Sequence, residues 1–174
     1  MGVRDTLSKI IVMFKTNFKK IFINSIIVFV IFLTDRISKI YILKISELES
    51  SVNIYVTQYV NSYLIWNKGI AFGLFSFNES LTYNLITFII ATITIIILVM
   101  IIKNVGFKRY SLLIVFGGSL GNLFDRIYYS AVPDFIDFHI NNFHWFVFNI
   151  ADIFITIGIV CLIFDEIFND SKKI

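Results

Sequence analysis

Four apolar segments constrain the fold of this chain more than any other feature of its sequence. A helix needs about 20 apolar residues to cross a hydrocarbon layer of ~30 Å, and four segments reach that length. They are residues 21–43, 81–102, 110–129 and 145–164. The composition agrees, since 57% of the residues are hydrophobic and 16% are charged, against about 25% charged in soluble domains. We therefore expect one all-α membrane domain, residues 1–174, with four transmembrane helices.

Basic residues predict the orientation of these helices, because Lys and Arg gather in cytoplasmic loops. Ten of the fifteen basic residues lie before the first segment, between the second and third, or in the tail. They are Arg4, Lys9, Lys15, Lys19, Lys20, Lys103, Lys108, Arg109, Lys172 and Lys173. Both termini should therefore be cytoplasmic. Apolar residues at steps of three and four in residues 1–20 predict a basic amphipathic helix on the membrane surface.

The two remaining connections, residues 44–80 and 130–144, should lie outside. Residues 52–75 are rich in Val, Ile, Tyr, Phe and Trp with partial alternation, a pattern typical of short strands. We expect a small extracytoplasmic β-rich segment between the first and second helices. The chain has no basic and aromatic pattern typical of nucleic-acid binding, so we expect no nucleic-acid partner.

Charged and polar side chains near the ends of the apolar segments need partners. Asp35 and Lys39 are four residues apart, which places them on one helix face as an ion pair, with Arg36 pointing elsewhere. Gly118, Gly121, Asn122 and Asp125 form one helical stripe whose glycines favour close helix packing. Asp125 beside Arg126 predicts an ion pair or a helix-end anchor.

Asp152 is the most informative residue, because an acid within a membrane segment favours a functional hypothesis. Asn149 and Thr156 share its helix face, and Asp134 and Asp137 lie in the preceding connection. Two carboxylates held close together cannot both ionise readily. Such a pair suits peptide hydrolysis, in which one carboxylate activates water and the other protonates the carbonyl oxygen. Spacing alone leaves open whether Asp134 or Asp137 is the partner.

Five short motifs recur in the order and spacing of a known family. They are TDRISK (34–39), NKGIAFGLF (67–75), GGSLGNLFDR (117–126), PDFIDF (133–138) and FNIADIFI (148–155). Together they resemble the signature blocks of lipoprotein signal peptidase, signal peptidase II. The resemblance implies an aspartic endopeptidase of the bacterial inner membrane, with its active site near the outer face. It would remove signal peptides from diacylglyceryl-modified prolipoproteins by cleaving before the lipidated cysteine.

The resemblance also implies roles for individual residues. Asp134 and Asp152 would be catalytic, and Asp137 would be a loop charge or local cap. Substrate binding would fall to Asn67, Gly118, Asn122, Arg126 and Asn149, and structural support to Asp35, Lys39, Asp125 and Asp137. We expect a monomer in contact with membrane lipids, without a cofactor, and inhibited by cyclic peptides.

Other readings remain open. A proton-coupled transporter could carry protons on Asp134 and Asp152, although its polar residues should then run through the full membrane depth. A non-catalytic assembly protein would tolerate Asp-to-Asn changes. His139 and His144 have no cysteine or HExxH pattern beside them to complete a zinc site, so we expect them to have a surface or interfacial role and expect no metal.

Overall fold

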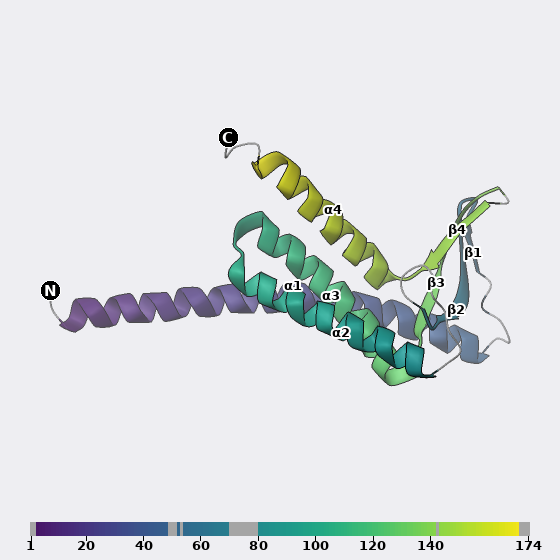
Figure 1. Ribbon diagram of the computed structural model, residues 1–174, viewed down its shortest axis with the longest axis horizontal. Coiled ribbons are helices and arrows are strands. Elements are labelled where there is room, and N and C mark those ends of the chain that lie inside the picture. The colour runs from purple at the N-terminus through teal and green to yellow at the C-terminus, as the bar shows by residue number, and fades with distance from the viewer. Residues whose placement is uncertain (1–2, 49–51, 53, 70–79, 142, 171–174) are drawn as a thin grey trace.

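The computed structural model describes residues 3–48, 52, 54–69, 80–141 and 143–170 (Figure 1). In this part of the chain it contains four helices and one antiparallel sheet of four strands. In chain order the elements are α1 (Val3–Leu48), β1 (Ile54–Thr57), β2 (Val60–Asn67), α2 (Ser80–Lys103), α3 (Gly106–Tyr129), β3 (Val132–Ile140), β4 (Phe143–Phe148) and α4 (Ile150–Asp170). The prediction of a mostly helical protein with a small β-rich part is confirmed.

Helix α3 lies at the centre of the helical part and contacts each of the other three helices. Its Leu112 and Leu113 are almost fully buried and form a core with Ile97 and Ile101 of α2. The outward side of α2 is apolar and exposed, as Phe88 illustrates at 69% exposure. By length and composition, one helix of the described part is suited to crossing a membrane, Leu81–Lys103.

Helix α1 runs without a break through the predicted amphipathic arm and the predicted first membrane segment (Figure 1). Its 46 residues span about 70 Å. The sequence 3–48 contains neither glycine nor proline, so nothing in it favours a helix end near residue 20. The predicted arm and the predicted first membrane segment are therefore parts of one helix.

The sheet corrects two expectations, one on the extent of the β-rich part and one on the start of the last helix. Strand β2 pairs with β3, with Ile65 opposite Asp134, so the connection after α3 supplies half of the sheet and the β-rich part is not confined to the segment before α2. Residues 145–148, expected to begin the last helix, belong to β4, and α4 begins at Ile150. The run FHWFVF is rich in aromatic residues, which favour strands, and β3 is available to pair with it.

The glycines of α3 allow neighbouring helices to approach closely. A Cβ atom on Gly118 would lie 2.6 Å from the carbonyl oxygen of Ala151 in α4, and one on Gly121 would lie 2.5 Å from a carboxylate oxygen of Asp35 in α1. The prediction that these glycines serve packing is confirmed. Gly118 was also expected to bind substrate, and this stays a prediction; in the fold it lies in the contact between α3 and α4.

Candidate functional site

The site is built where β4 ends and α4 begins. Asn149 caps the helix: its Oδ1 atom accepts a hydrogen bond from the backbone NH of Asp152 at 3.2 Å. In return, Oδ2 of Asp152 accepts one from the backbone NH of Asn149 at 3.1 Å. This reciprocal pair is a capping box, and it fixes the position of the Asp152 carboxylate in the first turn of α4. Asn149 is fully buried and Asp152 is 8% exposed.

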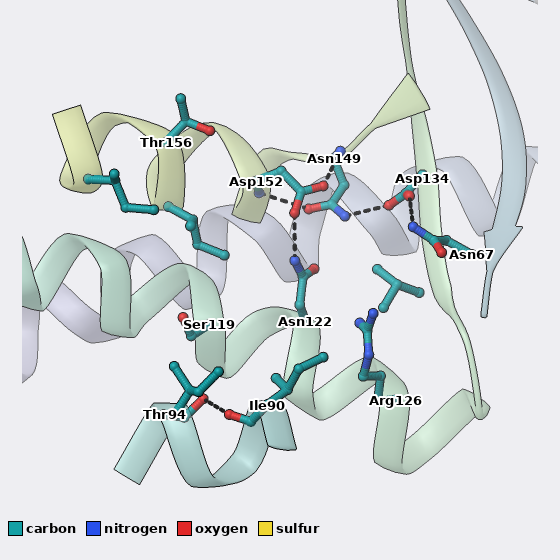
Figure 2. Close-up of a pocket in the computed structure, with 14 residues that line it drawn as sticks. Asn67, Ile90, Thr94, Ser119, Asn122, Arg126, Asp134, Asn149, Asp152 and Thr156 are labelled. Carbon is teal, nitrogen blue, oxygen red and sulfur yellow. Dashed lines mark hydrogen bonds between the residues drawn. The ribbon is translucent and has the colours of Figure 1, made fainter. Parts of the chain in front are cut away.

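Asn149 also reaches Asp134 (Figure 2). Its Nδ2 atom donates a hydrogen bond to Oδ1 of Asp134 at 2.6 Å, while Nδ2 of Asn67, at the end of β2, donates to Oδ2 of Asp134 at 2.8 Å. Asp134 is 2% exposed. Asn149 therefore links the two carboxylates that the sequence singled out: its side-chain amide donates to Asp134 and its backbone NH donates to Asp152.

The other candidate partner, Asp137, lies elsewhere. Side chains alternate between the two faces of a strand, and Asp134 and Asp137 are an odd number of residues apart on β3. Asp137 instead contacts His144, with Oδ2 and Nδ1 2.8 Å apart. Two roles were expected for Asp137, a solvated loop charge or a local cap, and the first is wrong because the residue is fully buried.

Burial sets the protonation of Asp134. Burial first, and then the neighbouring charge of Asp152, raise the pKa of this carboxyl from 3.8 to about 7, although the hydrogen bonds from Asn149 and Asn67 partly oppose the shift. Near neutral pH, Asp134 can therefore both hold and release a proton.

The raised pKa of Asp134 predicts a pH dependence of stability. The folded chain holds this proton more tightly than the unfolded chain, so the stability it contributes is fully present below pH 3.8 and is lost as pH rises through about 7. We expect the Tm of the wild type, relative to Asp134→Asn, to fall across that interval, because the amide does not ionise. Thermal unfolding of both proteins in one detergent over this pH range checks the expectation, and parallel curves would contradict it.

Asn122 connects Asp152 to a buried lysine, Lys39. Its Nδ2 atom donates to Oδ1 of Asp152 at 2.8 Å, and its Oδ1 atom accepts from Nζ of Lys39 at 2.9 Å. An ammonium group only donates hydrogen bonds, so Lys39 orients the amide oxygen of Asn122 toward itself. The amide NH₂ is thereby directed at Asp152.

Lys39 belongs to a buried network of four charged residues between α1 and α3. Lys39 lies 2.9 Å from Asp35 and 2.6 Å from Asp125, and Arg36 holds both carboxylate oxygens of Asp125 at 2.5 and 2.8 Å. Asp35 also accepts a hydrogen bond from the backbone NH of Ala151, at 3.0 Å. The network thus ties the start of α4 to α1.

Two details of this network differ from the sequence expectations. The pair of Asp35 and Lys39 is confirmed, but Arg36 does not point elsewhere: it joins the same network. The expected ion pair of Asp125 with Arg126 is replaced by pairs of Asp125 with Arg36 and Lys39. Adjacent residues on a helix do not face each other, and α1 supplies the cations instead.

A cavity of about 370 Å³ opens beside the two aspartates (Figure 2). Its polar end holds the amides, carboxylates and guanidinium of Asn67, Asn122, Arg126, Asp134, Asn149 and Asp152. Its remaining lining is Ile90, Ile93, Thr94, Ser119, Val132, Ile155, Thr156 and Ile159. Arg126 donates a hydrogen bond to the carbonyl oxygen of Gly69. Residues 70–75 of the motif that begins at Asn67 lie outside the described residues.

The sequence pattern missed one cluster, formed by Asp137, His139 and His144. Strand alternation places the first two on one face, but their approach to His144 depends on the pairing of β3 with β4. That pairing could have been inferred only by recognising residues 132–148 as a hairpin.

Comparison with known proteins gives one consistent result. Residues 27–168 match the family model described as signal peptidase (SPase) II. The chain is 55% identical over 159 residues to a lipoprotein signal peptidase of Pelagibacter ubique (strain HTCC1062), covering 91% of this chain and 96% of the relative. It is 38% identical over 156 residues to that of Anaplasma phagocytophilum (strain HZ), covering 88% and 97%.

Solved structures agree with these relatives. One bacterial membrane enzyme, determined by the in meso method at 2.3 Å resolution, aligns with a TM-score of 0.69 and 28% identity, covering 87% of this chain and 91% of that one. A second, at 1.9 Å resolution, aligns with a TM-score of 0.62 and 27% identity, covering 81% and 90%.

Proposed function

Because the chain belongs to the signal peptidase II family, we propose that it is an aspartic endopeptidase that removes signal peptides from diacylglyceryl-modified prolipoproteins, cleaving before the lipid-bearing cysteine. One observation supports this most strongly: two buried carboxylates, Asp134 and Asp152, are held through Asn149 at the polar end of a cavity whose remaining lining is mostly apolar. The acid pair is suited to activating water for peptide hydrolysis, and the apolar walls are suited to an apolar substrate segment.

In the proposed reaction the two carboxylates share one proton. The ionised member takes a proton from a water molecule as it attacks the scissile carbonyl, and the protonated member donates its proton to the carbonyl oxygen. As the C–N bond then breaks, the first member gives its new proton to the departing amine, and the second takes a proton back from a hydroxyl of the tetrahedral intermediate. A pKa of about 7 suits Asp134 to this exchange near neutral pH. The measured pH profile would report values that belong to the pair.

The neighbouring polar groups are suited to positioning the substrate backbone. Nε of Arg126 is buried and has no hydrogen-bond partner among the described residues, so it is available to a substrate carbonyl. Asn67 and Asn122 each hold one carboxylate and border the same space. We infer that Arg126 binds substrate directly and that the asparagines orient both the aspartates and the peptide.

We further infer that all four helices cross the bacterial inner membrane, with both termini cytoplasmic and the sheet at the outer face. Helices α2, α3 and α4 have 24, 24 and 21 residues, or about 32–36 Å, which exceeds the ~30 Å hydrocarbon core. The substrate would then enter the cavity sideways from the bilayer.

Labelling by an impermeant thiol reagent should reach a Tyr55→Cys variant from outside and a Lys108→Cys variant only after the membrane is opened. The reverse pattern would overturn the orientation.

Cleavage assays test the proposed function. The purified chain, in detergent or liposomes, is given a diacylglyceryl-modified prolipoprotein and the same precursor with its lipid-accepting cysteine changed to serine. We expect cleavage of the lipidated form alone, a new N-terminus at the lipidated cysteine by mass spectrometry, and inhibition by cyclic peptides. Absence of cleavage, or equal cleavage of both precursors, would overturn the proposal, and proton-coupled transport would be assayed next.

A further inference from the structure

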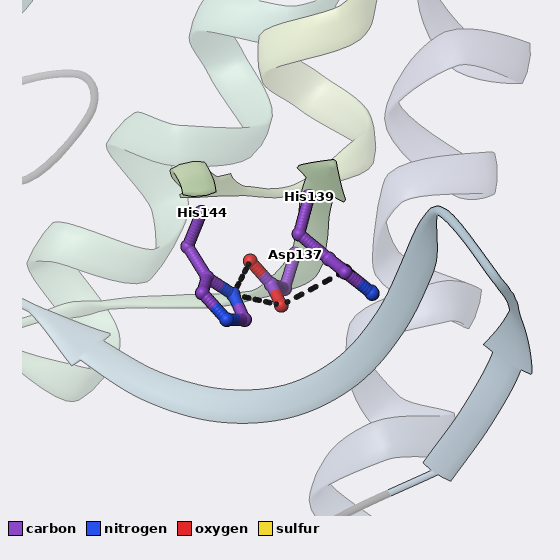
Figure 3. A group of neighbouring side chains, drawn as sticks. All are labelled: Asp137, His139 and His144. Carbon is purple, nitrogen blue, oxygen red and sulfur yellow. Dashed lines mark hydrogen bonds and ion pairs between the residues drawn. The ribbon is translucent and has the colours of Figure 1, made fainter. Parts of the chain in front are cut away.

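Asp137, His139 and His144 form a compact cluster on the hairpin of β3 and β4 (Figure 3). His139 lies directly opposite His144 in the pairing of the two strands, and their rings stack with centroids 5.1 Å apart. One oxygen or nitrogen atom from each of the three side chains lies within 4.8 Å of the others. These side chains supply two imidazoles and one carboxylate to a common point.

The distances within the cluster are close to those of a metal site. Two ligands at ~2.1 Å from a tetrahedral zinc ion are about 3.4 Å apart. Nδ1 of His139 lies 3.5 Å from Oδ2 of Asp137. Nδ1 of His144 lies 2.8 Å from the same oxygen and 3.1 Å from Oδ1. Both histidine-to-carboxylate distances therefore lie within about 0.6 Å of the spacing in a zinc site.

The charges in the cluster also favour a cation. Asp137 is fully buried, and within the described part of the chain its ion-pair partners are the two histidines, with no lysine or arginine. A buried carboxylate is costly without a compensating charge. In addition, Nδ1 of His139 is buried and makes no hydrogen bond within the described residues. A single bound cation would account for both observations.

We propose that Asp137, His139 and His144 bind one divalent transition-metal ion, with zinc the best match to two imidazoles and a carboxylate. The side chain of His144 is 52% exposed, which gives an ion access from solvent. Asp137 projects from the face of β3 opposite to Asp134, so this site is separate from the aspartate pair. An ion here would cross-link β3 to β4. It would therefore stabilise both β3, which carries Asp134, and β4, which leads to Asn149.

Cobalt substitution tests the site directly. The purified full-length chain, without a histidine tag and stripped with a chelator, is titrated with Co²⁺ while visible d–d absorption is recorded, and Zn²⁺ is then added in competition. We expect one Co²⁺ per chain, displacement by Zn²⁺, and a Tm that rises with Zn²⁺ concentration. His144→Ala, which changes an exposed ligand, should weaken binding by roughly tenfold or more.

Glu166→Gln is the matched control, because Glu166 is an exposed carboxylate on α4 that pairs with Lys108, and it should bind Co²⁺ as the wild type does. The wild-type titration decides the question even if His144→Ala fails to fold. Absence of d–d absorption in the folded wild type would overturn the proposal and leave a plain histidine and aspartate ion pair. Equal binding by the wild type and folded His144→Ala would overturn it as well.

Discussion

Asp134→Asn and Asp152→Asn are each expected to lower cleavage of a lipidated prolipoprotein by at least about 10²–10⁴-fold. Each positioned proton transfer contributes a factor of that size, and each carboxylate takes part in more than one transfer in the proposed reaction. Asparagine keeps nearly the same shape and one acceptor oxygen, so the hydrogen bond from Asn149 to residue 134, or from Asn122 to residue 152, can remain. The second hydrogen bond to each aspartate is lost, because the new NH₂ group faces a donor. Because the two acids act as a unit, the double variant should be little worse than either single variant.

Asp137→Asn is the informative control for this pair. It changes a buried aspartate of the same strand that lies on the opposite face, and it should keep activity within a few-fold as long as the protein stays folded. Size-exclusion chromatography and thermal unfolding check the folded state of all three variants. Loss of activity in a folded Asp137→Asn, with activity retained in Asp134→Asn, would mean that the wrong aspartate of β3 has been assigned to the pair.

Lys39→Met is expected to destabilise the protein by about 3–5 kcal/mol, the cost of removing one partner from a buried ion pair. Lys39 is fully buried and contacts Asp35, Asp125 and Asn122. Without it, Arg36 alone faces two buried carboxylates. Thermal unfolding in detergent measures the loss, and cleavage should fall as well, because the amide of Asn122 is no longer oriented toward Asp152.

Two further variants separate this effect from the loss of any lysine. Lys44→Met removes an exposed lysine from the same helix and should leave Tm nearly unchanged. Adding Asp35→Asn to Lys39→Met should recover part of the stability, since it removes the uncompensated charge while the amide oxygen can still accept the NH of Ala151. If Lys39→Met and Lys44→Met behave alike, the buried network does not stabilise the fold as described.

Local patterns in the sequence predicted much of the helical architecture and of the candidate site. Helices α2 and α3 fall within a few residues of the predicted segments, because hydropathy and helix ends are properties of short stretches. The pair of Asp35 and Lys39 also follows from spacing on one helix. The catalytic roles of Asp134 and Asp152 remain predictions, supported by the family resemblance and by their contacts with Asn149.

Contacts between distant segments could not be predicted in the same way. Residue spacing could not choose between Asp134 and Asp137 as the neighbour of Asp152, because the choice depends on which face of β3 meets α4; the family resemblance alone favoured Asp134. Nor could it place Arg36 against Asp125, 89 residues away.

The sequence by itself determined that the chain is an apolar, mostly helical protein with the motifs of its family and with acids at the ends of its helices. Only the tertiary structure decided which acid meets which partner: Asn149 links Asp134 to Asp152, and Lys39 orients Asn122. The physical reason is that hydropathy and helical spacing act within one segment. The pairing of β3 with β2 and β4, and the packing of α4 on α3, join segments whose separation in the chain carries no such signal.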